Sequence, residues 1–82
     1  MLIRFRFLCV DLPALTGVQE VDVADGSTVK QALESLEKKS NTEGLLSKLS
    51  ETMFLIGKNP ARPDTILKDW DEVYVIRLLH GG

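Results

Sequence analysis

The first residues of the chain alternate between apolar and polar side chains. In the stretch LIRFRFLCV this period of two is typical of a strand with one buried face, which would hold Ile3, Phe5, Phe7 and Cys9. A second β-rich run, VQEVDV, covers residues 18–23, and residues 13–17 before it suit a hairpin loop. The pattern therefore predicts two antiparallel strands at the start of the chain.

The period of the pattern changes after Asp25. Apolar side chains now recur at i, i+3, i+4 and i+7, on Val29, Ala32, Leu33 and Leu36, while charged residues take the other side. Ser27 or Thr28 can cap the first turn by accepting a hydrogen bond from a free backbone amide. This segment is the clearest helix in the sequence, and we expect its apolar stripe to pack on the first and last strands.

The middle of the chain contains, in order, a segment that can cover the core, a strand and a loop. Residues 41–51 offer Leu45, Leu46 and Leu49 for a short second helix or an irregular cover, although Gly44 weakens the case for a helix. TMFLIG, residues 52–57, is an apolar run of strand length. KNPARPD, residues 58–64, is predicted to be a loop because two prolines and an asparagine oppose regular structure.

The end of the chain completes a mixed sheet. Residues 65–71 can hold at most a very short strand and a turn, and EVYVIRLL, residues 72–79, is the last strand. The first and last strands are the most apolar, so we expect them to be central, parallel neighbours joined by a crossover that contains the helix. Residues 1–82 are thus predicted to form a single α+β domain, a β-grasp with four to five strands and one main helix across one face.

Composition excludes several classes of function. Ten Lys and Arg against twelve Asp and Glu give a net charge of −2 without a basic stripe, which disfavours nucleic acid as a partner. No signal peptide or membrane-spanning run is present, and the single Cys9 is predicted to be a core residue, so we expect a cytoplasmic protein without membrane contact. A chain of 82 residues has little room for its own substrate cleft, so any chemistry is expected to be shared with a partner.

Three motifs together resemble a known family. DGSTVKQALESL, residues 25–36, combines a turn, a capping residue and the helix; Asp69 to Val73 form a D-x-D-E-V turn into the last strand; and the sequence closes on Gly81-Gly82. Over its whole length the chain resembles the ubiquitin-like sulfur carriers of the MoaD and ThiS families. The apparent insertion at residues 41–50 is more similar to the small subunit of molybdopterin synthase than to the shorter thiamine-pathway carrier.

The resemblance implies a function for the end of the chain. The carboxylate of Gly82 would be adenylated by an E1-like enzyme with ATP and converted to a thiocarboxylate that donates sulfur. Leu79, His80 and Gly81 would thread into the partner's active site as a flexible tail, residues 79–82, because glycine has no Cβ to crowd the reacting groups. The sequence has no phosphate-binding glycine motif, so ATP would be used by the activating partner, and we expect no cofactor or metal bound to this chain.

The resemblance leaves several roles open. The leading hypothesis is the small subunit of molybdopterin synthase, with an E1-like enzyme and the large subunit or an equivalent sulfur acceptor as partners. The alternatives are a carrier for thiamine or another sulfur metabolite, and a ubiquitin-like modifier or interaction module without sulfur chemistry. Arg77, two leucines and His80 stand where the family tail usually has prolines and a small residue, so the tail does not identify the partner.

Two further groups of side chains have alternative interpretations. Phe54, Trp70 and Tyr74 are expected to be core or half-buried sheet residues rather than a binding site. Arg4, Arg6 and Arg77 would form a basic strip if the first and last strands are neighbours, but solvated side chains are the favoured interpretation.

Overall fold

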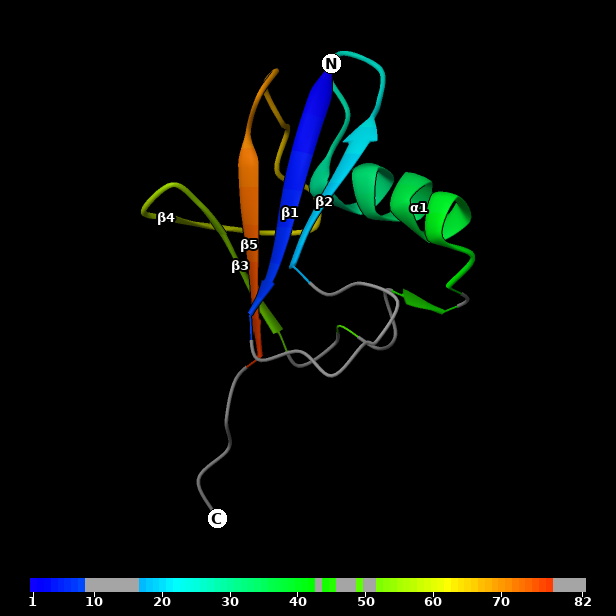
Figure 1. Cartoon of the computed structure of the whole chain (residues 1–82). Helices are drawn as coiled ribbons and strands as arrows, with labels where there is room; N and C mark the ends of the chain where they lie inside the picture. The colour runs from blue at the N-terminus through cyan, green and yellow to red at the C-terminus, as the bar shows by residue number, and fades with distance from the viewer. Residues whose placement is uncertain (9–16, 43, 46–48, 50–51, 78–82) are drawn as a thin grey trace.

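The computed structural model describes residues 1–8, 17–42, 44–45, 49 and 52–77. The elements, in chain order, are β1 (Leu2–Leu8), β2 (Gly17–Asp22), α1 (Val29–Ser40), β3 (Thr52–Ile56), β4 (Asn59–Ala61) and β5 (Glu72–Arg77). The five strands form one sheet in the order β2-β1-β5-β3-β4, and α1 crosses one of its faces (Figure 1).

The centre of the sheet is the parallel pair β1 and β5, in which Phe5 lies opposite Val73. β2 runs antiparallel to β1 on one side, and β3 runs antiparallel to β5 on the other. The prediction that the first and last strands are parallel neighbours is therefore confirmed. The mixed sheet with one helix across it is the predicted β-grasp architecture.

The helix α1 begins where the sequence predicts it. Thr28 is the N-cap, and its hydroxyl accepts from the Gln31 amide at 3.2 Å while the Gln31 side chain accepts from the Thr28 amide at 2.9 Å. This reciprocal capping box satisfies two amides that a helix start leaves free. The helix ends at Asn41, whose φ of 56° lies in the left-handed region that a C-terminal cap requires.

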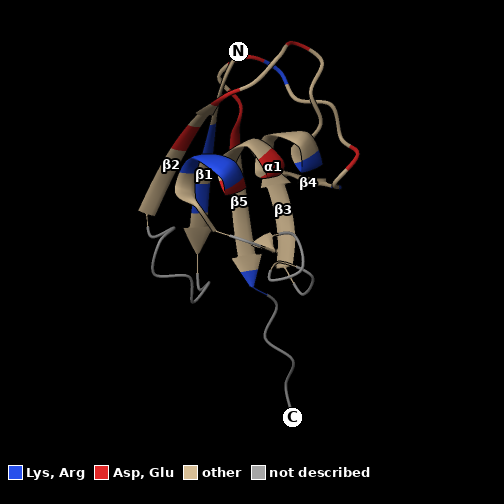
Figure 2. Ribbon diagram, turned by 90° about the vertical axis from the view of Figure 1, so that its right-hand side faces the viewer, with Lys and Arg blue, Asp and Glu red and all other residues tan. Residues whose placement is uncertain are grey.

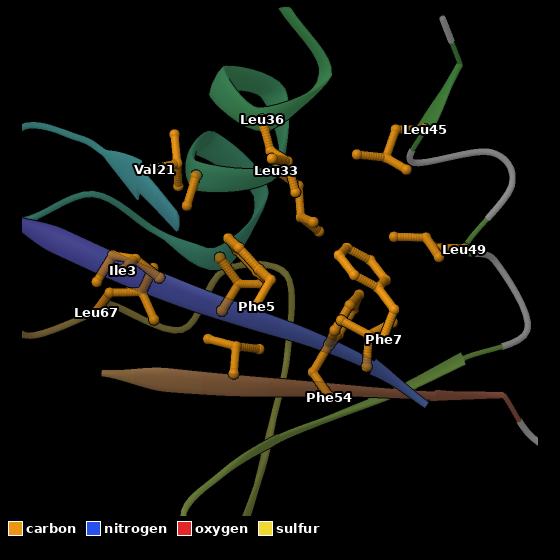
Figure 3. Close-up of a cluster of buried hydrophobic side chains, with 14 residues drawn as sticks. Ile3, Phe5, Phe7, Val21, Leu33, Leu36, Leu45, Leu49, Phe54 and Leu67 are labelled. Carbon is orange, nitrogen blue, oxygen red and sulfur yellow. The ribbon is translucent and has the colours of Figure 1, made fainter. Parts of the chain in front are cut away.

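The core lies between α1 and the sheet (Figure 3). Val29, Ala32, Leu33 and Leu36 of the helix and the alternating residues Ile3, Phe5, Phe7, Val73 and Val75 of the central strands belong to one buried cluster, as predicted. Leu45 and Leu49 join this cluster, so these two leucines do cover the core. The apolar face of the helix and the apolar face of the sheet therefore pack together in a single core.

One predicted loop contains a strand. Residues 59–61 of the KNPARPD segment form β4, which pairs with β3 so that Pro60 lies opposite Leu55. The prediction is wrong because β4 is an edge strand, where no further strand needs the amide that proline lacks. Gly57, with a φ of 64°, allows the tight reversal between β3 and β4. Residues 65–71 contain only an isolated bridge, between Thr28 and Ile66, and a turn, as predicted.

Several sequence predictions lie outside the described residues, namely those on Cys9, on Leu46 and on residues 79–82. Within the described part of the chain, no helix has the length and apolar character needed to cross a membrane.

Candidate docking face and reactive tail

The face of the sheet opposite α1 is built from the residues that alternate with the core positions. In β1 these are Leu2, Arg4, Arg6 and Leu8, and in β5 they are Glu72, Tyr74 and Ile76. Met53 and Leu55 continue this face on β3, and Val18 and Glu20 continue it on β2. We call this surface the open face.

The open face changes from polar to apolar along β5. Across its amino end, Glu20, Arg4 and Glu72 lie side by side in register. Across its carboxyl end, Leu8 and Met53 flank Ile76 from the two neighbouring strands. Leu8 is 43% exposed and Met53 is 36% exposed, so this apolar row is presented to the solvent. Neighbouring exposed apolar side chains of this kind are typical of an interaction site.

The arginines of the open face are paired. Arg4 Nε lies 2.9 Å from Glu20 Oε2, and Arg6 Nε lies 2.8 Å from Glu72 Oε1. Arg77 alternates onto the other face of the sheet, since Tyr74 and Ile76 belong to the open face. The possible basic strip of Arg4, Arg6 and Arg77 is therefore not formed, and the charges mix along the strands in Figure 2.

Glu72 and Tyr74 form a polar pair next to Arg6. A hydrogen bond from Tyr74, assisted by the charge of Arg6, lowers the pKa of Glu72 below its ordinary value of 4.5. The same hydrogen bond raises the pKa of Tyr74 above 10.0. A hydrogen bond to an ionised carboxylate favours the charged form, which explains the direction of the Glu72 shift. At neutral pH the pair is ionised Glu72 and neutral Tyr74.

The three aromatic residues singled out in the sequence have different environments. Phe54 is 6% exposed and belongs to the core, and Tyr74 is half-buried, as predicted. Trp70 is 67% exposed, so the expectation of burial is wrong for this residue. It lies in a turn before β5 rather than in a strand, and its backbone takes a φ of 71°.

The predicted tail residues Leu79, His80, Gly81 and Gly82 lie outside the described residues. The structure does place the end of β5, at Arg77, beside the apolar row of the open face. Leu8, Met53 and Ile76 were not identified from the sequence as site residues. The signal for them was present, because each alternates with a core position in its own strand.

A comparison with models of protein families assigns the chain to a family. The model of the ThiS family matches residues 11–82, so the chain belongs to the ThiS family. The resemblance to MoaD and ThiS proteins is thereby confirmed, and membership supports a role as a sulfur carrier. No curated protein matches the chain.

Solved structures share the fold. SAMP1 from Haloferax volcanii is 21% identical with a TM-score of 0.80 and full coverage of both chains. A putative molybdopterin converting factor subunit 1 from Pyrococcus furiosus is 15% identical with a TM-score of 0.70, covering 95% of this chain and 98% of that one. Subunits of molybdopterin-converting factor from Helicobacter pylori 26695 form a solved complex, in which the matching chain is 20% identical with a TM-score of 0.62 and full coverage of both chains.

Proposed function

We propose that the protein is a sulfur carrier that works through the carboxylate of Gly82. The observation that carries the proposal is the position of the apolar row, which lies at the end of β5 from which the chain continues to Gly81 and Gly82. A partner that covers this row lies beside Arg77, from which the sequence continues to Gly82. A docking surface and a terminal Gly-Gly are what a substrate protein needs, and family membership supports the same role.

The proposed chemistry has two steps on the same carboxyl group. A carboxylate oxygen of Gly82 attacks the α-phosphorus of ATP, which forms an acyl adenylate and releases pyrophosphate. A sulfur nucleophile at the oxidation level of sulfide then attacks the acyl carbon, AMP leaves, and a thiocarboxylate remains. The activating E1-like enzyme supplies the ATP site and the catalytic groups. This chain supplies the acyl group and a surface by which it is held.

The partner that accepts the sulfur is proposed to be a synthase large subunit. The Helicobacter pylori complex contains subunits 1 and 2 of molybdopterin-converting factor, and this chain shares the fold of its matching chain. We therefore propose a role in molybdopterin biosynthesis, with thiamine or another sulfur metabolite as the alternative product. A cytoplasmic location is part of the same proposal. The contact with the large subunit should bury about 1,200 to 2,000 Å² in total, as stable complexes do.

Two variants at the end of the chain test the proposal. Intact mass first verifies that the purified protein ends at Gly82. Addition of one alanine after Gly82 moves the carboxylate one residue further along, and deletion of Gly82 draws it one residue back. With the activating enzyme and ATP, both variants should bind as the wild type does but form neither acyl adenylate nor thiocarboxylate. Glu34→Ala, on the exposed side of α1, is the control that should react normally. Sulfur transfer by either tail variant would refute the proposal.

A modifier function is the second candidate. Its support is the fold shared with SAMP1, which a second Haloferax volcanii structure, 16% identical with a TM-score of 0.71, names as small archaeal modifier protein 1. In this case Gly82 would end in an isopeptide bond to a lysine of another protein. Trypsin cleaves this chain after Arg77, so digested cell extracts would then contain lysines that carry a Leu-Leu-His-Gly-Gly branch. A carrier without modifier activity leaves no such peptides.

A further inference from the structure

The turn that precedes β5 holds a tryptophan in a conformation that favours glycine. The Lys68 carbonyl accepts from the Asp71 amide at 3.0 Å, which closes a four-residue turn. Trp70 occupies the third position with a φ of 71°, as in a type II turn, where glycine or asparagine is usual. A bulky side chain at this φ is costly unless the surrounding structure enforces it.

The surrounding hydrogen bonds hold this turn on β1. The Trp70 amide donates to the Leu2 carbonyl at 2.8 Å, and the Leu2 amide donates to Asp69 Oδ1 at 2.8 Å. The Asp71 carboxylate accepts from the Lys68 amide at 2.8 Å. The indole is therefore presented on a fixed backbone, yet it is 67% exposed. Neither folding nor core packing requires a tryptophan here, whereas tryptophans on a rigid scaffold are frequent anchors of protein interfaces.

The surface beside the turn is hollowed at Lys68 and Asp71, although Trp70 itself does not line the hollow. A groove of about 250 Å³ is lined by Ile56, Pro60 and Ile66 and by Lys68 and Asp71 of the turn. Ile66 is itself 66% exposed. The turn thus offers an aromatic side chain that can enter a partner and a groove that can receive an apolar side chain in return.

The charge around Trp70 indicates what kind of partner fits. Asp69 and Asp71 flank it, Asp22 lies opposite Leu2 in the sheet, and Asp25 lies 3.8 Å from the N-terminal amine. Figure 2 shows acidic segments near the N-terminus with a basic one among them, and Lys68 of the turn leaves the acidic side chains in excess. This acidic setting repels nucleic acid, anionic membranes and the same end of a second copy. It favours a protein pocket lined by Lys or Arg, which also attract the face of an indole.

The position of the turn separates it from the reactive tail. Trp70 precedes β5 and Arg77 ends it, and at about 3.3 Å per residue the two lie roughly 20 Å apart. Under the proposed function the carboxyl group of Gly82 reacts twice, first as the carboxylate with ATP and then as the acyl adenylate with the sulfur donor. A contact at the far end of the sheet can hold the carrier on the enzyme through both reactions without occupying the reacting end.

From these observations we infer that Trp70 and the adjacent groove are a second docking contact, specific to a basic apolar pocket on the activating enzyme. The inference rests on the proposed function for the identity of that enzyme. The large subunit, which receives the finished thiocarboxylate and has one step to perform, does not use this contact.

The test measures binding rather than chemistry. The dissociation constants of wild type, Trp70→Gly and Trp70→Asn are measured against the purified E1-like enzyme and the purified large subunit of the same organism. Both substitutions suit a positive φ, so urea unfolding should show stability equal to or above that of the wild type. Binding to the activating enzyme should weaken about tenfold or more, as for an interface anchor. Binding to the large subunit should change less than about twofold.

A charge variant tests the basic pocket. Asp69→Asn keeps an oxygen that can accept from the Leu2 amide but removes the charge. It should weaken binding to the activating enzyme at low salt and lose this effect at high salt. Three results would each overturn the inference. Both Trp70 variants could bind the activating enzyme as the wild type does, or they could lose equal affinity for both partners. The wild type could also form a dimer that Trp70→Gly dissociates. If the wild type binds the activating enzyme through Trp70 but is never adenylated, the proposed function is refuted, whereas the docking contact is confirmed.

Discussion

Leu33 lies on the side of α1 that faces the sheet and is completely buried. Leu33→Ala removes three carbon atoms from a close-packed interior, so we expect unfolding to become easier by about 2 to 5 kcal/mol. The free energy of unfolding from urea titrations measures this loss. The neighbouring Glu34 is exposed, and Glu34→Ala should change stability little. Equal stability of both variants would contradict the assigned core.

Tyr74, together with the charge of Arg6, lowers the pKa of Glu72 on the open face. Because the hydrogen bond from Tyr74 lowers the pKa of Glu72, the ionised carboxylate stabilises the fold above the ordinary pKa of 4.5. This contribution is lost as the pH falls through the lower, folded-state pKa. Tyr74→Phe should therefore raise the pKa of Glu72 in a carboxyl NMR titration, and part of the acid stability should disappear. An unchanged titration of Glu72 would show that the hydrogen bond does not form in solution.

At the level of secondary structure, the start of α1 depends on the capping box of Thr28 and Gln31. Thr28→Ala removes the hydroxyl that accepts from the Gln31 amide and should cost about 1 kcal/mol of stability. Thr28→Ser keeps this hydroxyl and should retain most of the stability. The free energies of unfolding of the two variants are measured by urea titration. If the hydroxyl caps the helix, Thr28→Ser is more stable than Thr28→Ala, and equal stabilities would contradict the cap.

The open face of the sheet should bind the large subunit through its apolar row. Met53→Glu places a charge in this row beside Ile76, on a residue that is exposed and can change without loss of the core. We expect its affinity for the large subunit to fall about tenfold or more. Ala24→Glu adds the same charge in an exposed loop and is the matched control. Similar affinities of the two variants would exclude the row as a docking site.

The patterns that the sequence predicts well are those enforced by burial. The alternation in β1 and the helical stripe of α1 predict the core because each apolar position faces the same interior. β4 was missed because Pro60 is a poor strand residue except at an edge, and edge position follows from the sheet order rather than from local sequence. The exposure of Trp70 was missed because hydrophobic residues are usually buried, whereas this one lies in a turn held by backbone hydrogen bonds.

For the molecule as a whole, the fold and the proposed chemistry occupy different parts of the chain. The sheet and helix provide a rigid body with an apolar row at one end and the Trp70 turn at the other. The reacting group of the proposal is a backbone carboxylate, which leaves no pattern of catalytic side chains for sequence analysis to detect. The proposed role of Gly81 and Gly82 rests on the β-grasp fold before them and on membership of the ThiS family.

The most direct test of the sulfur-carrier function is the intact mass of the wild-type protein after incubation with its activating enzyme, ATP and a sulfide source. We expect a mass increase equal to the exchange of one oxygen for sulfur, localised by fragmentation to Gly82 and absent without ATP. Treatment with an alkylating reagent specific for thiocarboxylates should then add one label to each chain. An unchanged mass with an active enzyme, or a sulfur atom localised to any other residue, would contradict a sulfur carrier that works through Gly82.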